Sequence, residues 1–120
     1  MKKHFYITTP IYYVNDKPHI GHAYTSLSVD ILKRYYTCIN ENSFFLTGTD
    51  EHGQKVQEAA NKRGMTEKAH VDEYVLRFKN LWEKLHISND DFIRTTEKRH
   101  TKQVKNLLID LYNRNEIYLD

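Results

Sequence analysis

Short apolar runs along the chain predict four β-strands. Residues 4–9 are aromatic and β-branched and stop at Pro10, which is typical of a strand followed by a loop. Similar runs at residues 43–47, 92–95 and 117–119 predict three further strands, and the run at 43–47 is expected to be broken by Gly48.

Between these runs, four segments carry apolar residues at helical spacing. The first is expected to begin near Ile20 and to end at about residue 37, and the second covers about 53–63 and stops at Gly64. Thr66 is predicted to cap the third helix and Thr96 the fourth. The stripes expected to face the core are Tyr24, Leu27, Ile31 and Tyr35 in the first helix, Val71, Val75, Phe78, Leu81, Trp82 and Leu85 in the third, and Val104, Leu107, Leu108 and Leu111 in the fourth.

Alternating strands and helices predict the α/β class, with a parallel sheet and helices on its faces. No repeat, low-complexity segment or Pro/Gly/Ser-rich linker divides the chain. A domain that closes on a strand is unusual, so we expect residues 1–120 to be part of a longer protein.

Composition narrows the class of protein. The chain has 120 residues, of which 39% are hydrophobic, and 18 basic residues balance 16 acidic ones. This mixture excludes a disordered tail and a membrane-spanning segment, and no apolar region follows the first lysines as it would in a secretory signal. The single Cys38 fits a reducing compartment, so a cytoplasmic location is expected.

The most informative stretch for chemistry is the start of the first helix. His19 and His22 are three residues apart, so they fall on one face of the first turn, where unpaired N–H groups attract anions. Both rings could donate Nε2–H bonds to phosphate oxygens, and Gly21 would let a flat ring or a phosphate approach the backbone. The same spacing also suits a metal pair or two surface histidines.

A second polar group follows the second predicted strand. In a parallel sheet, loops at the carboxyl ends of the strands lie on one edge, so Asp50 is expected near the histidines. Its carboxylate could hold a substrate ammonium group. For Glu51 we expect a role at the start of the next helix. His4, His70, His86 and His100 are expected to be surface or internally satisfied residues, whereas His52 could face a ligand or support the turn at Gly53.

Three segments together make the chain similar to a known family. They are residues 5–22, residues 45–53 and residues 92–97, and the first ends in the tetrapeptide HIGH. In this combination they resemble the methionyl-tRNA synthetases, which are class I aminoacyl-tRNA synthetases. The HIGH region of the match comprises Tyr12, Tyr13, Val14, Asn15, Asp16, Lys17, Pro18, His19, Ile20, Gly21 and His22.

The resemblance implies a Rossmann-like catalytic domain of the HUP type and a two-step reaction. Methionine and ATP, with Mg²⁺, would give methionyl-adenylate, and the methionyl group would pass to tRNA(Met). The histidines of HIGH would bind ATP phosphates, with the adenine over Gly21. Ile11 and Tyr13 would contact the methionine side chain, and Asp50 would hold its ammonium group. Tyr12 is expected to pack against the sheet instead.

The resemblance also shows which family features lie outside these residues. They are the KMSKS signature, the connective insertion that often carries zinc, and the anticodon-binding domain. The chain is therefore expected to be the amino-terminal portion of the catalytic domain, with little or no activity alone.

Three other functions stay open. A different H-x-G-H nucleotidyltransferase, such as a pantetheine-phosphate adenylyltransferase-like protein, would suit a short chain. A metal-dependent hydrolase could use His19, His22 and Asp50 as ligands. A non-catalytic binding fragment is the third possibility.

Overall fold

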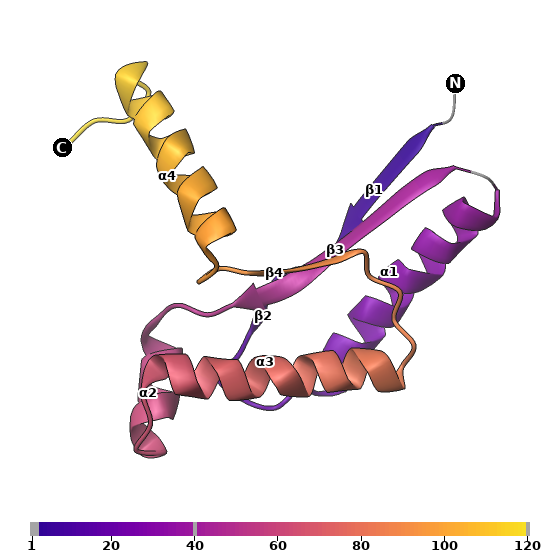
Figure 1. Cartoon of the computed structure of the whole chain (residues 1–120), viewed down its shortest axis with the longest axis horizontal. Coiled ribbons are helices and arrows are strands. Elements are labelled where there is room, and N and C mark those ends of the chain that lie inside the picture. The colour runs from indigo at the N-terminus through magenta and orange to yellow at the C-terminus, as the bar shows by residue number, and fades with distance from the viewer. Residues whose placement is uncertain (1–2, 40, 120) are drawn as a thin grey trace.

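The computed structural model describes residues 3–39 and 41–119. Within these residues, four strands and four helices follow one another (Figure 1). In chain order they are β1 (His4–Thr8), β2 (Tyr12–Tyr13), α1 (Ile20–Cys38), β3 (Asn42–Asp50), α2 (Gln54–Lys62), α3 (Glu67–Lys84), β4 (Asp91–Arg94) and α4 (Lys98–Asn113).

All strand pairs in the sheet are parallel, as predicted, and β3 is the central strand. Its Thr49 pairs with Tyr12 of β2 on one edge and with Arg94 of β4 on the other. β1 pairs with the first half of β3, from the partners His4 and Asn42 onward. This register brings the carboxyl ends of β2, β3 and β4 together at one edge.

Strand β3 is longer than expected, because Gly48 does not break it. Gly48 lies opposite Ile93 of β4, where a Cβ atom would stand 2.1 Å from the Ile93 carbonyl oxygen. The glycine therefore permits two strands to approach closely, and the strand continues through it to Asp50.

A hydrophobic core lies between α3, α2 and the segment around β2. Its buried members are Tyr12, Val14, Val56, Val71, Tyr74, Val75, Phe78 and Trp82. The periodicity of α3 thus gave the correct buried face, and Leu81 packs partly buried against it. The predicted end of α2 and start of α3 are also confirmed: Gly64 has a φ of 63° after α2, and the Thr66 side chain accepts the Ala69 N–H.

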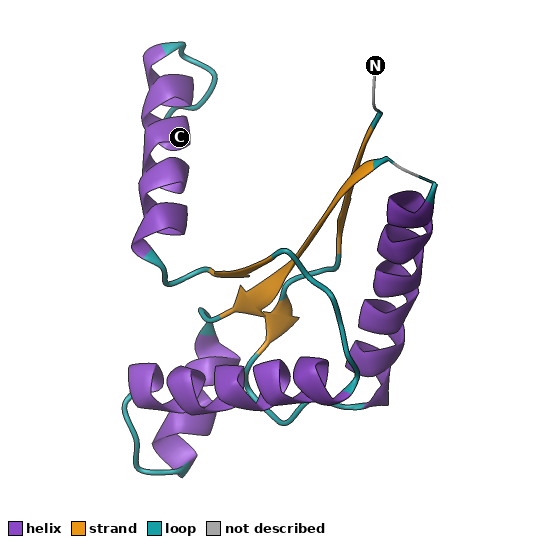
Figure 2. Ribbon diagram, turned by 45° about the vertical axis from the view of Figure 1, so that its right-hand side comes forward, coloured by secondary structure: helices purple, strands orange, loops and turns teal. Residues whose placement is uncertain are grey.

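Helix α1 runs beside β1 and β3 (Figure 2), but its predicted stripe is wrong. Tyr24, Ile31 and Tyr35 are exposed, whereas Ala23, Ser26, Val29 and Asp30 form the buried face. Polar residues can lie on this buried face because they have hydrogen-bond partners: the Asp30 carboxylate accepts the N–H of Ser88, in the loop before β4, at 2.7 Å.

Helix α4 projects away from the sheet, and none of its residues is buried (Figure 1). The expected stripe of Val104, Leu107 and Leu108 is exposed, and Leu111 is only half-buried. Residues 117–119, predicted to be a strand, have no strand partner among residues 3–39 and 41–119 and form no strand.

No helix in the described part of the chain is long and apolar enough to cross a membrane.

Candidate active site

The site forms where β2 and β3 end side by side. Tyr13 pairs with Asp50 in the sheet, and the two residues line one pocket of about 690 Å³. We call it the Asp50 pocket; it is lined by Tyr13, Asp50, His52, Gly53, Gln54, Lys55 and Glu58. Tyr13 itself is 59% exposed, so its ring is available at the mouth of this pocket.

A second pocket of about 540 Å³ adjoins the first, because Tyr13 lines both. We call it the histidine pocket; it is lined by Pro10, Ile11, Tyr12, Tyr13, Asn15, Asp16, Lys17, His19 and His22. The sequence grouped Ile11 with Tyr13 and Asp50, whereas in the structure Ile11 lines only the histidine pocket.

The two histidines cap α1 through their Nδ1 atoms. Nδ1 of His19 accepts the Gly21 N–H at 3.1 Å, and Nδ1 of His22 accepts the His19 N–H at 3.0 Å. A neutral imidazole that accepts at Nδ1 carries its proton on Nε2. Neither Nε2 atom has a partner among residues 3–39 and 41–119, so both rings offer an N–H donor at the positive end of a helix.

Packing holds His22 in its neutral form. Its ring stands edge-on to Tyr12 and Phe78, with centroid separations of 4.8 and 5.1 Å. Burial is the main cause that lowers the pKa of His22, and the nearby charge of His19 lowers it further. The His19 ring lies 3.8 Å from that of His22, centroid to centroid.

Gly21 makes room for the ring of His19. A Cβ atom there would lie 2.9 Å from Cε1 of His19. The missing side chain therefore leaves room for the His19 ring to fold back over the first turn of α1.

The loop before the histidines is anchored from α3. The buried His70 ring contacts the Val14 carbonyl through Nε2 at 3.0 Å, and its Nδ1 lies 3.2 Å from the Arg63 guanidinium. Because Arg63 can only donate, Nδ1 of His70 accepts and its Nε2–H donates to Val14. His70 is thus an internally satisfied histidine, and Tyr12 is buried as expected, with its hydroxyl bonded to Ser26.

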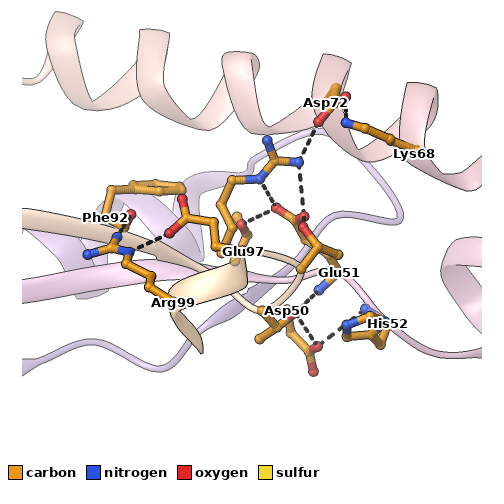
Figure 3. A network of polar contacts seen from close by, with 12 residues as sticks. Asp50, Glu51, His52, Lys68, Asp72, Phe92, Glu97 and Arg99 are labelled. Atoms are coloured by element: carbon orange, nitrogen blue, oxygen red, sulfur yellow. Dashed lines mark hydrogen bonds and ion pairs between the residues drawn. The ribbon is translucent and has the colours of Figure 1, made fainter. Parts of the chain in front are cut away.

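Asp50 and Glu51 point in opposite directions (Figure 3). The Asp50 carboxylate faces the Asp50 pocket, where Oδ1 lies 3.4 Å from the backbone nitrogen of His52 and 3.4 Å from the Thr95 hydroxyl. Both distances are long for hydrogen bonds, so most of the accepting capacity of the carboxylate is unused.

The expected role of Glu51 at the start of α2 is wrong. Gly53 is the N-cap of α2 and makes no side-chain cap bond, and the Glu51 side chain is buried against β4 instead. There it accepts bonds from both Nε and Nη2 of Arg94, at 2.6 and 2.9 Å. Thr96, predicted to cap α4, also donates to Glu51, and Glu97 is the N-cap of α4.

Sequence reasoning gave Arg94 and Thr95 no role at the site and gave Thr96 only that of a helix cap, although all three lie in the segment 92–97 that carried the family resemblance. The available signal was the polar run at the carboxyl end of a predicted strand, at the same sheet edge as Asp50.

The described residues of the candidate site do not include a set of metal ligands. Within residues 3–39 and 41–119, no three His, Cys, Asp or Glu side chains are grouped so that they could hold a metal ion. His19, His22 and Asp50 therefore do not form such a group.

Comparison with known proteins gives a consistent result. A family model described as class I tRNA synthetases (M) matches residues 5–120. Methionine–tRNA ligase from Streptomyces coelicolor is 53% identical over 117 residues, which are 97% of this chain and 22% of that protein. The corresponding protein from Fusobacterium nucleatum is 49% identical over 118 residues, 98% of this chain and 19% of its own length. The chain thus spans about a fifth of the length of these relatives.

Two solved structures resemble the chain closely. Mycobacterium tuberculosis methionyl-tRNA synthetase in complex with methionyl-adenylate superposes with a TM-score of 0.95 at 41% identity, over 98% of this chain and 23% of that one. A leucyl synthetase from Agrobacterium radiobacter, in a ternary complex with tRNA, has a TM-score of 0.91 at 23% identity and shares the fold.

Proposed function

The chain belongs to the class I tRNA synthetases of the methionine group, as the resemblance indicated, and we propose that it supplies the HIGH half of a methionine-activating site. The observation that carries this proposal is the pair of histidine Nε2–H donors at the start of α1, in a pocket that shares Tyr13 with the Asp50 pocket.

The histidine pocket is proposed to receive the phosphates of ATP. As negative charge develops on the oxygens around the α-phosphorus, His19 and His22 donate Nε2–H bonds to them, and the α1 dipole adds positive potential. The capping bonds fix both rings before the substrate arrives, so no reorganisation is needed in the transition state. Gly21, close under the His19 ring, is the proposed contact for the adenine.

The Asp50 pocket is proposed to receive methionine. Asp50 pairs with the α-ammonium group, since its carboxylate is accessible and makes only long contacts within the chain. Tyr13 gives apolar surface for the thioether side chain, and Ile11, which lines the adjoining histidine pocket, is the proposed second contact where the two pockets meet at Tyr13. Tyr13, which borders both pockets, places the amino acid next to ATP.

The proposed reaction has two steps. A carboxylate oxygen of methionine attacks the α-phosphorus, the bond from that phosphorus to the bridging oxygen breaks, and pyrophosphate leaves. The terminal ribose hydroxyl of tRNA(Met) then attacks the carbonyl carbon of methionyl-adenylate, and AMP leaves. ATP is expected to enter with Mg²⁺ as part of the substrate, and the cytoplasm is the proposed compartment.

Methionine-dependent ATP–pyrophosphate exchange tests this function. The assay uses the full-length enzyme that carries this chain, and also a chimera in which the chain replaces the matching segment of the Streptomyces coelicolor ligase. We expect exchange in both, and a loss of at least about 100-fold in His22→Ala and in Asp50→Ala, because each removes a charge-stabilising contact. The isolated 120-residue chain is expected to show little or no exchange.

Matched variants serve as controls. His4→Ala changes an exposed histidine on β1 and Asp110→Ala an exposed aspartate on α4, and neither should alter exchange by more than about twofold. Undiminished exchange in His22→Ala or Asp50→Ala would show that the proposed site is wrong.

A further inference from the structure

The hydroxyl of Thr95 lies where β4 ends, beside the carboxylate proposed to bind the amino acid. Thr95 is 7% exposed, and its Oγ1 is 2.9 Å from the Glu51 nitrogen and 3.4 Å from Oδ1 of Asp50. We propose that Thr95 is a positioning residue, which orients the Asp50 carboxylate toward the ammonium group of the amino-acid substrate. This inference rests on the proposed function of Asp50.

The donors and acceptors around this hydroxyl allow only one arrangement. The Glu51 N–H can only donate, so the Thr95 oxygen accepts it through a lone pair. The single hydroxyl proton is then free for Asp50, whose ionised carboxylate can only accept. One side chain thus fixes the backbone after Asp50 and the side chain of Asp50 together.

Backbone pairing and an ion pair hold Thr95 itself in place. Its N–H donates to the Thr49 carbonyl at 3.2 Å, which extends the β3–β4 ladder by one bond. The preceding Arg94 donates to the buried Glu51 carboxylate through two nitrogens and to Asp72 on α3 at 2.6 Å. The hydrogen bond to Glu51 is also the main cause that raises the pKa of Arg94, so the guanidinium stays charged.

The length of the contact to Asp50 suits a positioning role. A short hydrogen bond would occupy the carboxylate oxygen and weaken its attraction for a cation. A contact at 3.4 Å restrains the rotation of the carboxylate and leaves it able to bind a cation. His52 contributes a second restraint of equal length, through its backbone N–H, to the same oxygen Oδ1. The other oxygen, Oδ2, has no partner within residues 3–39 and 41–119.

Two substitutions at this position separate the hydroxyl from the shape of the side chain. Thr95→Val removes the hydroxyl at nearly constant volume, and Thr95→Ser keeps it. Thr47→Val is the matched control: Thr47 is a buried threonine on β3, and its hydroxyl bonds to Thr9 at 2.7 Å. All three are made in the full-length enzyme or in the chimera, and assayed by ATP–pyrophosphate exchange.

In Thr95→Val we expect the KM for methionine to rise about tenfold, while the KM for ATP and kcat stay within about twofold. The inhibition constant of methioninol, which keeps the ammonium group, should rise by the same factor. That of 4-(methylthio)butanoate, which lacks it, should not change. Thr95→Ser and Thr47→Val should both behave like the unsubstituted enzyme.

Each other outcome overturns the inference. An unchanged KM for methionine in Thr95→Val shows that the hydroxyl does not act on Asp50. An equal rise for 4-(methylthio)butanoate shows general damage to the pocket, and an equal loss in Thr95→Ser shows that the hydroxyl is not the cause. Absence of methionine-dependent exchange in the unsubstituted enzyme is a different result, because it refutes the proposed function itself.

Discussion

Replacing Gly48 by alanine should separate the two strands that position Asp50 and Thr95. An added Cβ would lie 2.1 Å from the Ile93 carbonyl oxygen and 2.6 Å from Cγ2 of Ile93. Ordinary van der Waals contacts of a Cβ atom begin at 3.4 Å, so β3 and β4 must move apart by roughly 1 Å. A shift of this size stretches the ladder bonds between them beyond hydrogen-bonding distance, and overpacking together with these lost bonds should cost about 3 kcal/mol of unfolding free energy.

Urea unfolding of the 120-residue chain measures this cost through the fluorescence of Trp82, which is the one tryptophan in the sequence and lies in the core. Gly64→Ala is the control, since nothing lies within 4 Å of the added atom and only its left-handed φ of 63° opposes alanine. That variant should lose about 1 kcal/mol. Equal losses in the two variants would refute the argument that close strand approach requires Gly48.

Two further predictions concern charged groups. The pKa of His22 is lowered in the folded chain, so unfolded molecules take up a proton first as the pH falls through 6.5, and the unfolding free energy should decrease from pH 7 to pH 5. This decrease should be smaller in His22→Gln, measured by urea unfolding at each pH; an identical decrease would contradict it. Arg94→Met leaves the buried Glu51 carboxylate without its main partner and should cost about 3 kcal/mol. The exposed ion pair of Arg114 and Asp110 is the comparison, and Arg114→Met should cost less than about 1 kcal/mol in the same assay. Similar losses of unfolding free energy in Arg94→Met and Arg114→Met would argue against burial as the cause.

Local signals predicted much of the fold. The structure confirms the buried stripe of α3 and the roles of Gly64 and Thr66, which precede this helix. These features depend only on residues within one or two helical turns, so a local pattern can predict them. The buried face of α1 could not be found in this way. Ser26 and Asp30 are buried because Tyr12 and Ser88 bond to them, and both partners are distant in sequence.

The same distinction applies to the candidate site. His19, His22 and Asp50 stand out because of their residue types and their places at predicted element ends. The role of Glu51 was mistaken, because its partner Arg94 lies 43 positions away and reaches it only through the register of β3 against β4. Helix periodicity also assigned a buried stripe to α4, since periodicity reveals an apolar face but not what covers it.

The parallel pairing of β1 with β3 also bears on the order of folding during synthesis. His4 pairs with Asn42, so the first strand has no sheet partner until at least 38 further residues have been made. At roughly 5–20 residues per second on a ribosome, this delay lasts about 2–8 seconds. Over that interval the aromatic residues of β1 and the histidines of α1 are present without the strand that aligns them. The amino-terminal half of the site is therefore made first but assembled only when β3 emerges, and a long-range pairing of this kind tends to be a slow step in folding.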